Sequence, residues 1–170
     1  APGVPSCADC HDAHAAAPPG ANEVADVCGH CHSETRDRFR ESPHAAASSS
    51  GRMEQCVTCH GNHLVQHPDF SRFDRPADRD DDASGTRCLE CHTDAADRGN
   101  RVAHAFGAGF RDADAKLAEA ERLVNAMAAD GFYADDEREA LARARRELVR
   151  AVPLSHSADL ARIEGSLRRV

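Results

Sequence analysis

The chain has few large aromatic side chains and no long apolar run. Aromatic residues make up 4% of its 170 residues, and tryptophan is absent. A globular core of this size normally depends on such side chains, so we expect something else to fill part of the interior. No stretch approaches the roughly 20 apolar residues that cross a bilayer. This predicts a soluble or peripheral protein without a membrane span.

Lysine is also scarce, so nearly all of the positive charge is arginine. Lys116 is the only lysine, and the formal net charge is −8. A strongly acidic balance argues against nucleic-acid binding, because the phosphate backbone attracts basic surfaces. It favours solubility and basic partner proteins.

The first residues resemble the start of a processed protein. The sequence begins at Ala1, with neither a methionine nor a charged segment followed by an apolar run. Cleavage of a secretory signal peptide leaves small residues around the cut. We therefore expect an exported protein, periplasmic or extracellular.

The composition changes near residue 108. All eight cysteines and ten of the eleven histidines precede this point, in a part rich in glycine, proline, serine and aspartate. Alanine, leucine, arginine and glutamate dominate 109–170. We expect two regions, 1–108 and 109–170, in a fold that is mostly helical and irregular with little or no sheet.

Three segments of the second region have a helical apolar period. Their inward positions are Ala113, Leu117, Ala120, Val124 and Met127, then Leu141, Ala144, Leu148 and Val152, then Leu160, Ile163 and Leu167. The expected boundaries are Gly131 at the end of the first helix, Asp135 or Asp136 as the cap of the second, Pro153 at its end, and Ser155 or Ser157 as the cap of the third. We expect a helical hairpin or bundle packed on the first region, in preference to a partner-binding hairpin.

Every cysteine belongs to a Cys-x-x-Cys-His unit. The units are Cys7, Cys10 and His11; Cys28, Cys31 and His32; Cys56, Cys59 and His60; and Cys88, Cys91 and His92. This pattern is the attachment signature of c-type haem. Two cysteines three residues apart share a helical turn, where their thiols form thioethers to one porphyrin, and the next histidine binds the iron. We expect four covalently bound haem c groups.

Two other functions use paired cysteines. Four such pairs could hold two tetrahedral zinc ions or act as redox dithiols. Neither function explains why a histidine follows the second cysteine in every unit, with no cysteine left over. Haem attachment is therefore the favoured interpretation.

Four histidines outside the motifs recur at matched offsets. They are His14 and His63, three residues after a motif histidine, and His44 and His104, twelve residues after one. The first region thus contains a two-fold repeat, 7–44 and 56–104. We expect these four histidines to be sixth iron ligands, which would make every haem bis-histidine. His14 and His63 lie one turn from a motif histidine, so each should reach a porphyrin other than its own.

The remaining histidines and the methionines carry weaker signals. His30 lies at a variable position inside a motif and is expected on the surface. His67 is a reserve ligand beside His63. His156 opens the third C-terminal helix, where iron ligation and capping both remain open. Met53 lies outside the repeat, and Met127 lies on an apolar helix face. We expect both to have packing or loop roles.

These motifs make residues 7–104 resemble the multihaem c-type cytochromes with doubled CxxCH units, such as the small tetrahaem cytochromes of anaerobic respiration. Pro43-His44 after a serine, and the segment from Cys59 to His63, look like ligand segments of that group. The resemblance implies respiratory electron transfer outside the cytoplasm, with redox partner proteins and closely stacked haems. The polypeptide would wrap a core made of haem.

Electron transfer without substrate chemistry is the leading prediction, because bis-histidine iron has no open position. One alternative is a subunit of a self-assembling extracellular filament, a homopolymer with end-to-end haem contacts. A second is a small-molecule reductase with one open haem. We also expect haem burial to drive folding of the first 108 residues, and the C-terminal segment alone to be only marginally helical.

Overall fold

The regular elements in the computed structural model are helices. The described residues are 5–11, 20, 23–53, 55–61, 63, 70–75 and 87–170. These residues contain no strand. The expected class, mostly helical and irregular with a C-terminal helical hairpin or bundle, is therefore confirmed.

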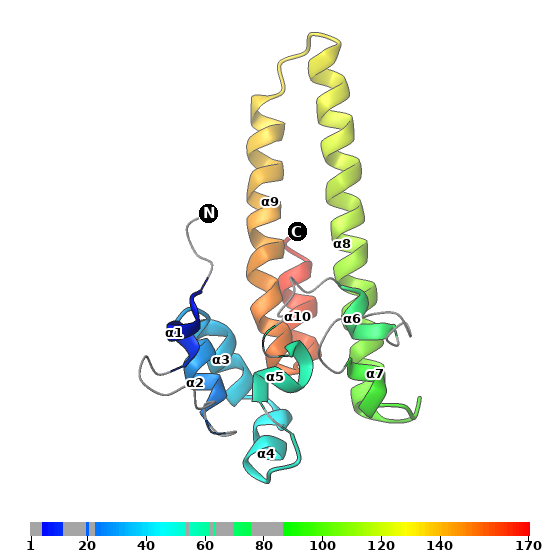
Figure 1. Ribbon diagram of the computed structural model, residues 1–170. Coiled ribbons are helices and arrows are strands. Elements are labelled where there is room, and N and C mark those ends of the chain that lie inside the picture. The colour runs from blue at the N-terminus through cyan, green and yellow to red at the C-terminus, as the bar shows by residue number, and fades with distance from the viewer. Residues whose placement is uncertain are drawn as a thin grey trace.

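Short helices occupy the first part of the chain (Figure 1). They are α1 (Cys7–Cys10), α2 (Val24–Gly29), α3 (Ser33–Arg40), α4 (Pro43–Ser49) and α5 (Gln55–His60). Helix α2 packs against α3 and α5, and α4 contacts both of these helices. Pro43 suits the first position of α4, where its missing N–H would have no intrahelical partner.

Two long helices dominate the second part and form an antiparallel hairpin. They are α8 (Arg98–Ala129) and α9 (Asp135–Leu154), preceded by α6 (Ser71–Asp74) and α7 (Cys88–Cys91) and followed by the 3-10 turn η1 (Ser155–Ser157) and α10 (Leu160–Leu167). Helix α10 returns alongside the base of the hairpin and contacts both long helices, while the hairpin tip projects away from the other helices (Figure 1).

Helix α8 begins earlier than the apolar period indicated. It starts after Asp97 and runs for 32 residues without interruption. The change in composition near residue 108 therefore lies inside one helix. The same helix carries His104 of the repeat and the apolar face of the bundle, so it connects the two expected regions rigidly.

The caps of the last two helices differ from the expected ones. Ala134 is the N-cap residue of α9, and Asp135 and Asp136 lie in its first turn, where acidic side chains interact favourably with the helix dipole. Helix α9 continues one residue past Pro153. Asp159 caps α10 by accepting a hydrogen bond from the backbone N–H of Arg162 at 3.2 Å.

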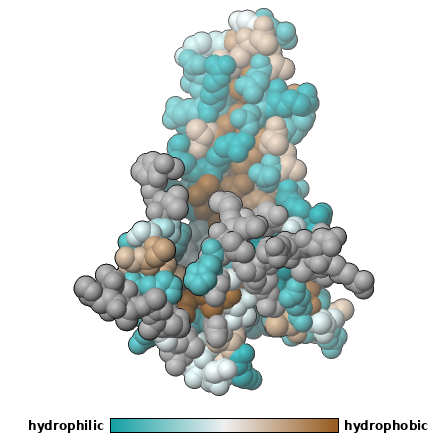
Figure 2. Space-filling model, viewed as in Figure 1, coloured by the Kyte–Doolittle hydropathy of each residue, from teal (hydrophilic) through white to brown (hydrophobic). Residues whose placement is uncertain are grey.

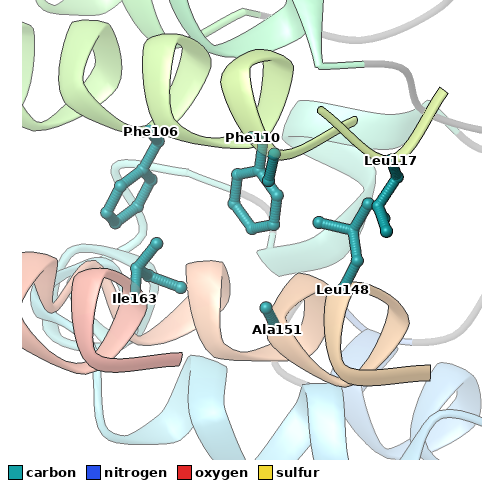
Figure 3. Packing of buried hydrophobic residues seen from close by; sticks show 7 residues of the cluster. Phe106, Phe110, Leu117, Leu148, Ala151 and Ile163 are labelled. Atoms are coloured by element: carbon teal, nitrogen blue, oxygen red, sulfur yellow. The ribbon is translucent and has the colours of Figure 1, made fainter. Parts of the chain in front are cut away.

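The apolar core lies where α8, α9 and α10 meet (Figure 3). Its buried cluster is Phe106, Phe110, Ala113, Leu117, Leu148, Ala151 and Ile163. The expected inward positions Leu117, Leu148 and Ile163 are thus confirmed as buried. Met127 is 39% exposed, because it lies beyond the stretch of hairpin that α10 covers.

Helix α6 is fixed on α8 by aromatic stacking and an ion pair. The rings of Phe70 and Phe73 stack on Phe110 with centroids 4.8 and 5.6 Å away. Asp74 accepts two hydrogen bonds from the Arg111 guanidinium, at 2.6 and 2.5 Å. Four of the six phenylalanines of the chain take part in this aromatic and apolar packing, which concentrates the scarce aromatic bulk in the bundle.

Most of the hairpin surface in Figure 2 is polar, although Leu123, Phe132, Tyr133 and Val149 are exposed apolar side chains of the hairpin. Hydrophilic side chains cover most of it in Figure 2, and hydrophobic ones gather along the seam toward its base. Among the described residues, no helix combines the length and the apolar character that crossing a membrane requires.

Candidate metal centres

Each Cys-x-x-Cys-His motif lies on or directly after a helical turn. The motifs map to α1, the end of α2, α5 and α7. In three of them the backbone N–H of the histidine donates to the carbonyl of the first cysteine: His11 to Cys7 at 2.9 Å, His32 to Cys28 at 3.0 Å and His92 to Cys88 at 3.0 Å. This bond closes the turn and brings two thiols and an imidazole to one short segment. All eight cysteines are free thiols.

Thiols of different motifs also lie close together. Cys28 and Cys56 share a hydrogen bond, which lowers the pKa of Cys28 to about 7 and raises that of Cys56. Burial raises the pKa of Cys88 to about 11, and the nearby Cys59 thiol adds to this shift. The third motif is therefore adjacent to both the second and the fourth.

Three motif histidines each face a second imidazole. The ring centroids of His11 and His63 are 5.9 Å apart, and the rings lie at 29° to each other. The His44 and His92 rings are 6.1 Å apart at 46°. The His60 and His156 rings are 6.0 Å apart at 19°.

These separations match two imidazoles that share one metal ion. An ion between two imidazoles lies about 2.0–2.1 Å from each ligating nitrogen, which places the ring centroids about 6 Å apart. A porphyrin supplies four nitrogens to its iron, so two imidazoles complete a six-coordinate set. The pairs and the paired thiols thus fit the ligand needs of covalently attached haem.

Hydrogen bonds fix the tautomer of two paired rings. The Nδ1 atom of His92 is bonded to the Asp97 carboxylate. The Nδ1 atom of His156 lies 3.3 Å from the carbonyl oxygen of Pro153, which only accepts hydrogen bonds. Nδ1 therefore carries the proton of neutral His156, and Nε2 keeps its lone pair. Metal-binding histidines have this arrangement, in which a carboxylate or carbonyl holds the other ring nitrogen.

Burial favours the neutral form of three paired imidazoles. It lowers the pKa of His44 and of His156. It lowers the pKa of His60 to about 4, with the adjacent His156 as the second cause. Metal ions bind the neutral form of imidazole, so these rings are ready to act as ligands at neutral pH.

The pairs join the two halves of the repeat. His11 belongs to the first half and its partner His63 to the second, while His44 belongs to the first half and its partner His92 to the second. His63 thus faces the histidine of the first motif, and His44 faces that of the fourth. Offsets along the chain indicated these histidines without indicating their partners.

The other expected ligands have different positions. His104 is exposed on α8, near enough to Asp74 to contribute to the lowered pKa of that carboxyl, which Arg111 mainly causes. The His32 ring forms no ring pair of this kind among the described residues, but it lies near enough to His60 and His156 to contribute to the lowered pKa of both. His14 and His67 lie outside the described residues. His30 is exposed, as expected.

Sequence reasoning gave little weight to His156, because this histidine lies outside the repeat and matches no offset. The available signal was Pro153, which lies three residues earlier, in the last turn of α9, and indicates that the helix ends close by. The part of the chain that the structure describes contains no group of three or more histidine, cysteine or acidic side chains placed to hold a metal ion. No family model, curated protein or solved structure significantly matches the chain.

Proposed function

We propose that the chain is an electron-transfer protein with four covalently attached haem c groups and no substrate chemistry of its own. Each motif attaches one haem through its two thiols, and its histidine is the proximal ligand. His63 is the sixth ligand of the first iron, and His44 is the sixth ligand of the fourth. The protein acts outside the cytoplasm, as its resemblance to multihaem cytochromes implies.

The observation that carries this proposal is the set of imidazole pairs at 5.9–6.1 Å. A Cys-x-x-Cys-His motif by itself accounts for one axial ligand. A second imidazole at the separation expected across an iron accounts for the other. Zinc binding by the thiols, or a dithiol function, gives no reason for motif histidines to face further histidines.

Haem iron supplies one-electron exchange between its ferric and ferrous forms, and the chain sets the conditions for this exchange. With haem bound, the paired imidazoles would leave the iron no open position and would exclude competing small molecules. Histidine ligands also keep the potential lower than a methionine ligand would. Asp97 and the Pro153 carbonyl hold two of the rings through Nδ1.

The arrangement of the motifs supports a connected path. His60 and His63 are three residues apart but face different imidazoles, so the first and third sites are neighbours. The Cys28–Cys56 hydrogen bond joins the second site to the third, and Cys88 lies near the third motif. The third site is thus next to all the others. Redox proteins are the expected partners, and the net charge of −8 favours basic ones.

The second motif supports one alternative, a reductase that acts on a small molecule at an open haem. His32 is exposed and forms no ring pair with another imidazole among the described residues, although His60 and His156 lie near it. Carbon monoxide distinguishes the two functions, because it binds ferrous haem only at an open position. The electron carrier should bind none, whereas a reductase should bind one equivalent per chain.

Haem content is tested by the intact mass of the exported protein after acid–acetone extraction. Thioether bonds survive this treatment, so the mass should exceed that of the chain by four haems. A variant with Cys88→Ser and Cys91→Ser should carry one haem fewer. Fewer than three haems in the parent protein, or zinc in their place, would contradict the proposal.

A further inference from the structure

The corner between α9 and α10 holds His156 in a fixed position. The hydroxyl of Ser155 donates to the Val152 carbonyl at 2.7 Å, and that of Ser157 donates to the Leu154 carbonyl at 2.7 Å. The final carbonyls of a helix have no intrahelical donor, so these bonds satisfy groups that α9 leaves open. Ala158 follows with a φ of 53° and turns the chain sharply. His156 therefore lies on a short, well-anchored turn.

This corner packs against the helix that directly follows the second motif. The 3-10 turn η1 contacts α3, and α3 also contacts α9. Arg162 of α10 forms an ion pair with Glu41, directly after α3. The C-terminal bundle is thus held against the first part of the chain on the side where His156 meets α5.

The repeat would assign another residue to the same place. In the two-fold repeat, His14 matches His63, and His11 matches His60. Because His63 faces His11, the symmetry of the repeat would place His14 opposite His60. The structure places His156 opposite His60, with ring centroids 6.0 Å apart and the two rings 19° from parallel. A residue of the C-terminal bundle, which has no counterpart in the repeat, thus lies beside the third motif.

We propose that His156 is the sixth ligand of the third haem iron, opposite His60. The free Nε2 of its ring is the ligating atom, because the Pro153 carbonyl holds Nδ1. This inference rests on the proposed function, since it requires a haem on the third motif. This ligation gives the C-terminal bundle a direct part in the redox site. One iron would join His60 and His156, which lie 96 positions apart, and so connect the bundle to the motif region, the part of the chain that carries the Cys-x-x-Cys-His units.

The test compares His156→Ala with the parent holoprotein. The variant should keep four haems by mass but lose one of its four low-spin haems. A high-spin ferric signal should replace it, one equivalent of carbon monoxide should bind after reduction, and added imidazole should restore the low-spin spectrum. His30→Ala is the matched control, because His30 is an exposed histidine within a motif. It should leave all four haems low-spin.

A second variant covers the case in which His156→Ala does not fold. His156→Met keeps a side chain that binds iron, so all haems should stay low-spin while the potential of one rises. Four low-spin haems and no carbon monoxide binding in His156→Ala would overturn the inference and return the position to His14, leaving the four-haem function intact. Unchanged potentials in His156→Met would equally count against it. A parent protein without haem would instead contradict the proposed function itself.

Discussion

At the fourth motif, the imidazole of His92 is held between a carboxylate and the start of a helix. Asp97 accepts a hydrogen bond from Nδ1, and the Asn100 side chain donates to the His92 carbonyl at 2.7 Å. A Cβ atom at Gly99 would lie 2.2 Å from the same Nδ1. Glycine is therefore required at this position, because a larger residue would push the ring out of place.

Asp97→Asn tests how this carboxylate tunes the fourth site. A carboxylate hydrogen-bonded to Nδ1 makes the imidazole a stronger donor to iron and favours the ferric form. A neutral amide weakens this effect, so the midpoint potential of one haem should rise by on the order of tens of millivolts. A spectroelectrochemical titration measures the shift.

Asp94→Asn is the matched control for this substitution. It removes the same charge from the same loop, but the Asp94 carboxylate bonds the backbone N–H of Ala96, at 2.8 Å, and not an imidazole. Its potentials should stay near those of the parent protein. Equal shifts in both variants would show a general charge effect and contradict the specific role of Asp97.

Sequence spacing predicted some of the individual residues of the candidate site. It singled out the motif residues together with His44 and His63, which the structure places opposite motif histidines. It could not give the pairing, because an offset of three or twelve residues describes position along the chain and not tertiary contact. His156 has no counterpart in the repeat, so only the folded corner reveals its neighbour.

Among the helices, the end of α8 shows how strongly a local signal can specify an element. Gly131 adopts a φ of 87°, its N–H donates to the Ala128 carbonyl at 3.1 Å, and the Phe132 N–H donates to the Met127 carbonyl at 3.0 Å. These two bonds form a Schellman motif, which depends on a left-handed residue after the helix. The sequence predicted this helix end correctly.

Gly131→Ala should destabilise the hairpin by roughly 1 kcal/mol, because an alanine in the left-handed region is strained. A Cβ at this position has no other atom within 4 Å, so the cost comes from the backbone alone. Thermal or urea unfolding of the holoprotein measures the change.

Gly165→Ala provides the opposite case within α10. Gly165 is helical, and its added Cβ would meet only the Arg168 guanidinium at 3.7 Å, an ordinary contact. Alanine is favoured over glycine in a helix by up to about 1 kcal/mol, so this variant should be at least as stable as the parent. If the two substitutions changed stability in the same direction, left-handed strain at Gly131 would not be the cause.

Caps were harder to predict from sequence than helix faces. The apolar period identified the buried side of α8, α9 and α10, because burial acts on every turn of a helix. A cap depends on one residue, and several serines and aspartates near each boundary were equally suitable. Ser155 and Ser157 satisfy carbonyls at the end of α9 instead of starting α10. Helix α8 starts after Asp97, a residue suited to the N-cap position, and it packs on both α6 and α7.

Across the whole molecule, buried apolar side chains are unevenly distributed. The main cluster lies in α8, α9 and α10, with Phe70 and Phe73 packed against it. Among the described residues before 70, the buried apolar side chains are Ala25 and Phe39. The bundle therefore has a core built from its own side chains, but the motif region does not. The cluster includes Phe106, which a segment starting at residue 109 would lack.

A haem-free chain should consequently lose only part of its structure. With all eight cysteines changed to serine, we expect the motif region to unfold, since haem burial drives its folding. The bundle should persist, because its cluster needs no cofactor. Hydrogen exchange followed by mass spectrometry separates the two regions within one sample. Backbone amides of 106–124 and 148–163 should remain protected, and those of 24–61 should exchange within the dead time.

The parent holoprotein is the reference for this experiment, and its motif region should be protected throughout. Protection of 24–61 without haem would show that the motif region folds by itself, and that the shortage of aromatic bulk there has no structural consequence. Loss of protection in the bundle as well would show that the third site, through His60 and His156, is needed to hold α9 and α10 in place. The expected pattern lies between these outcomes: a helical bundle that folds first and presents His156 to a motif region that haem attachment then orders.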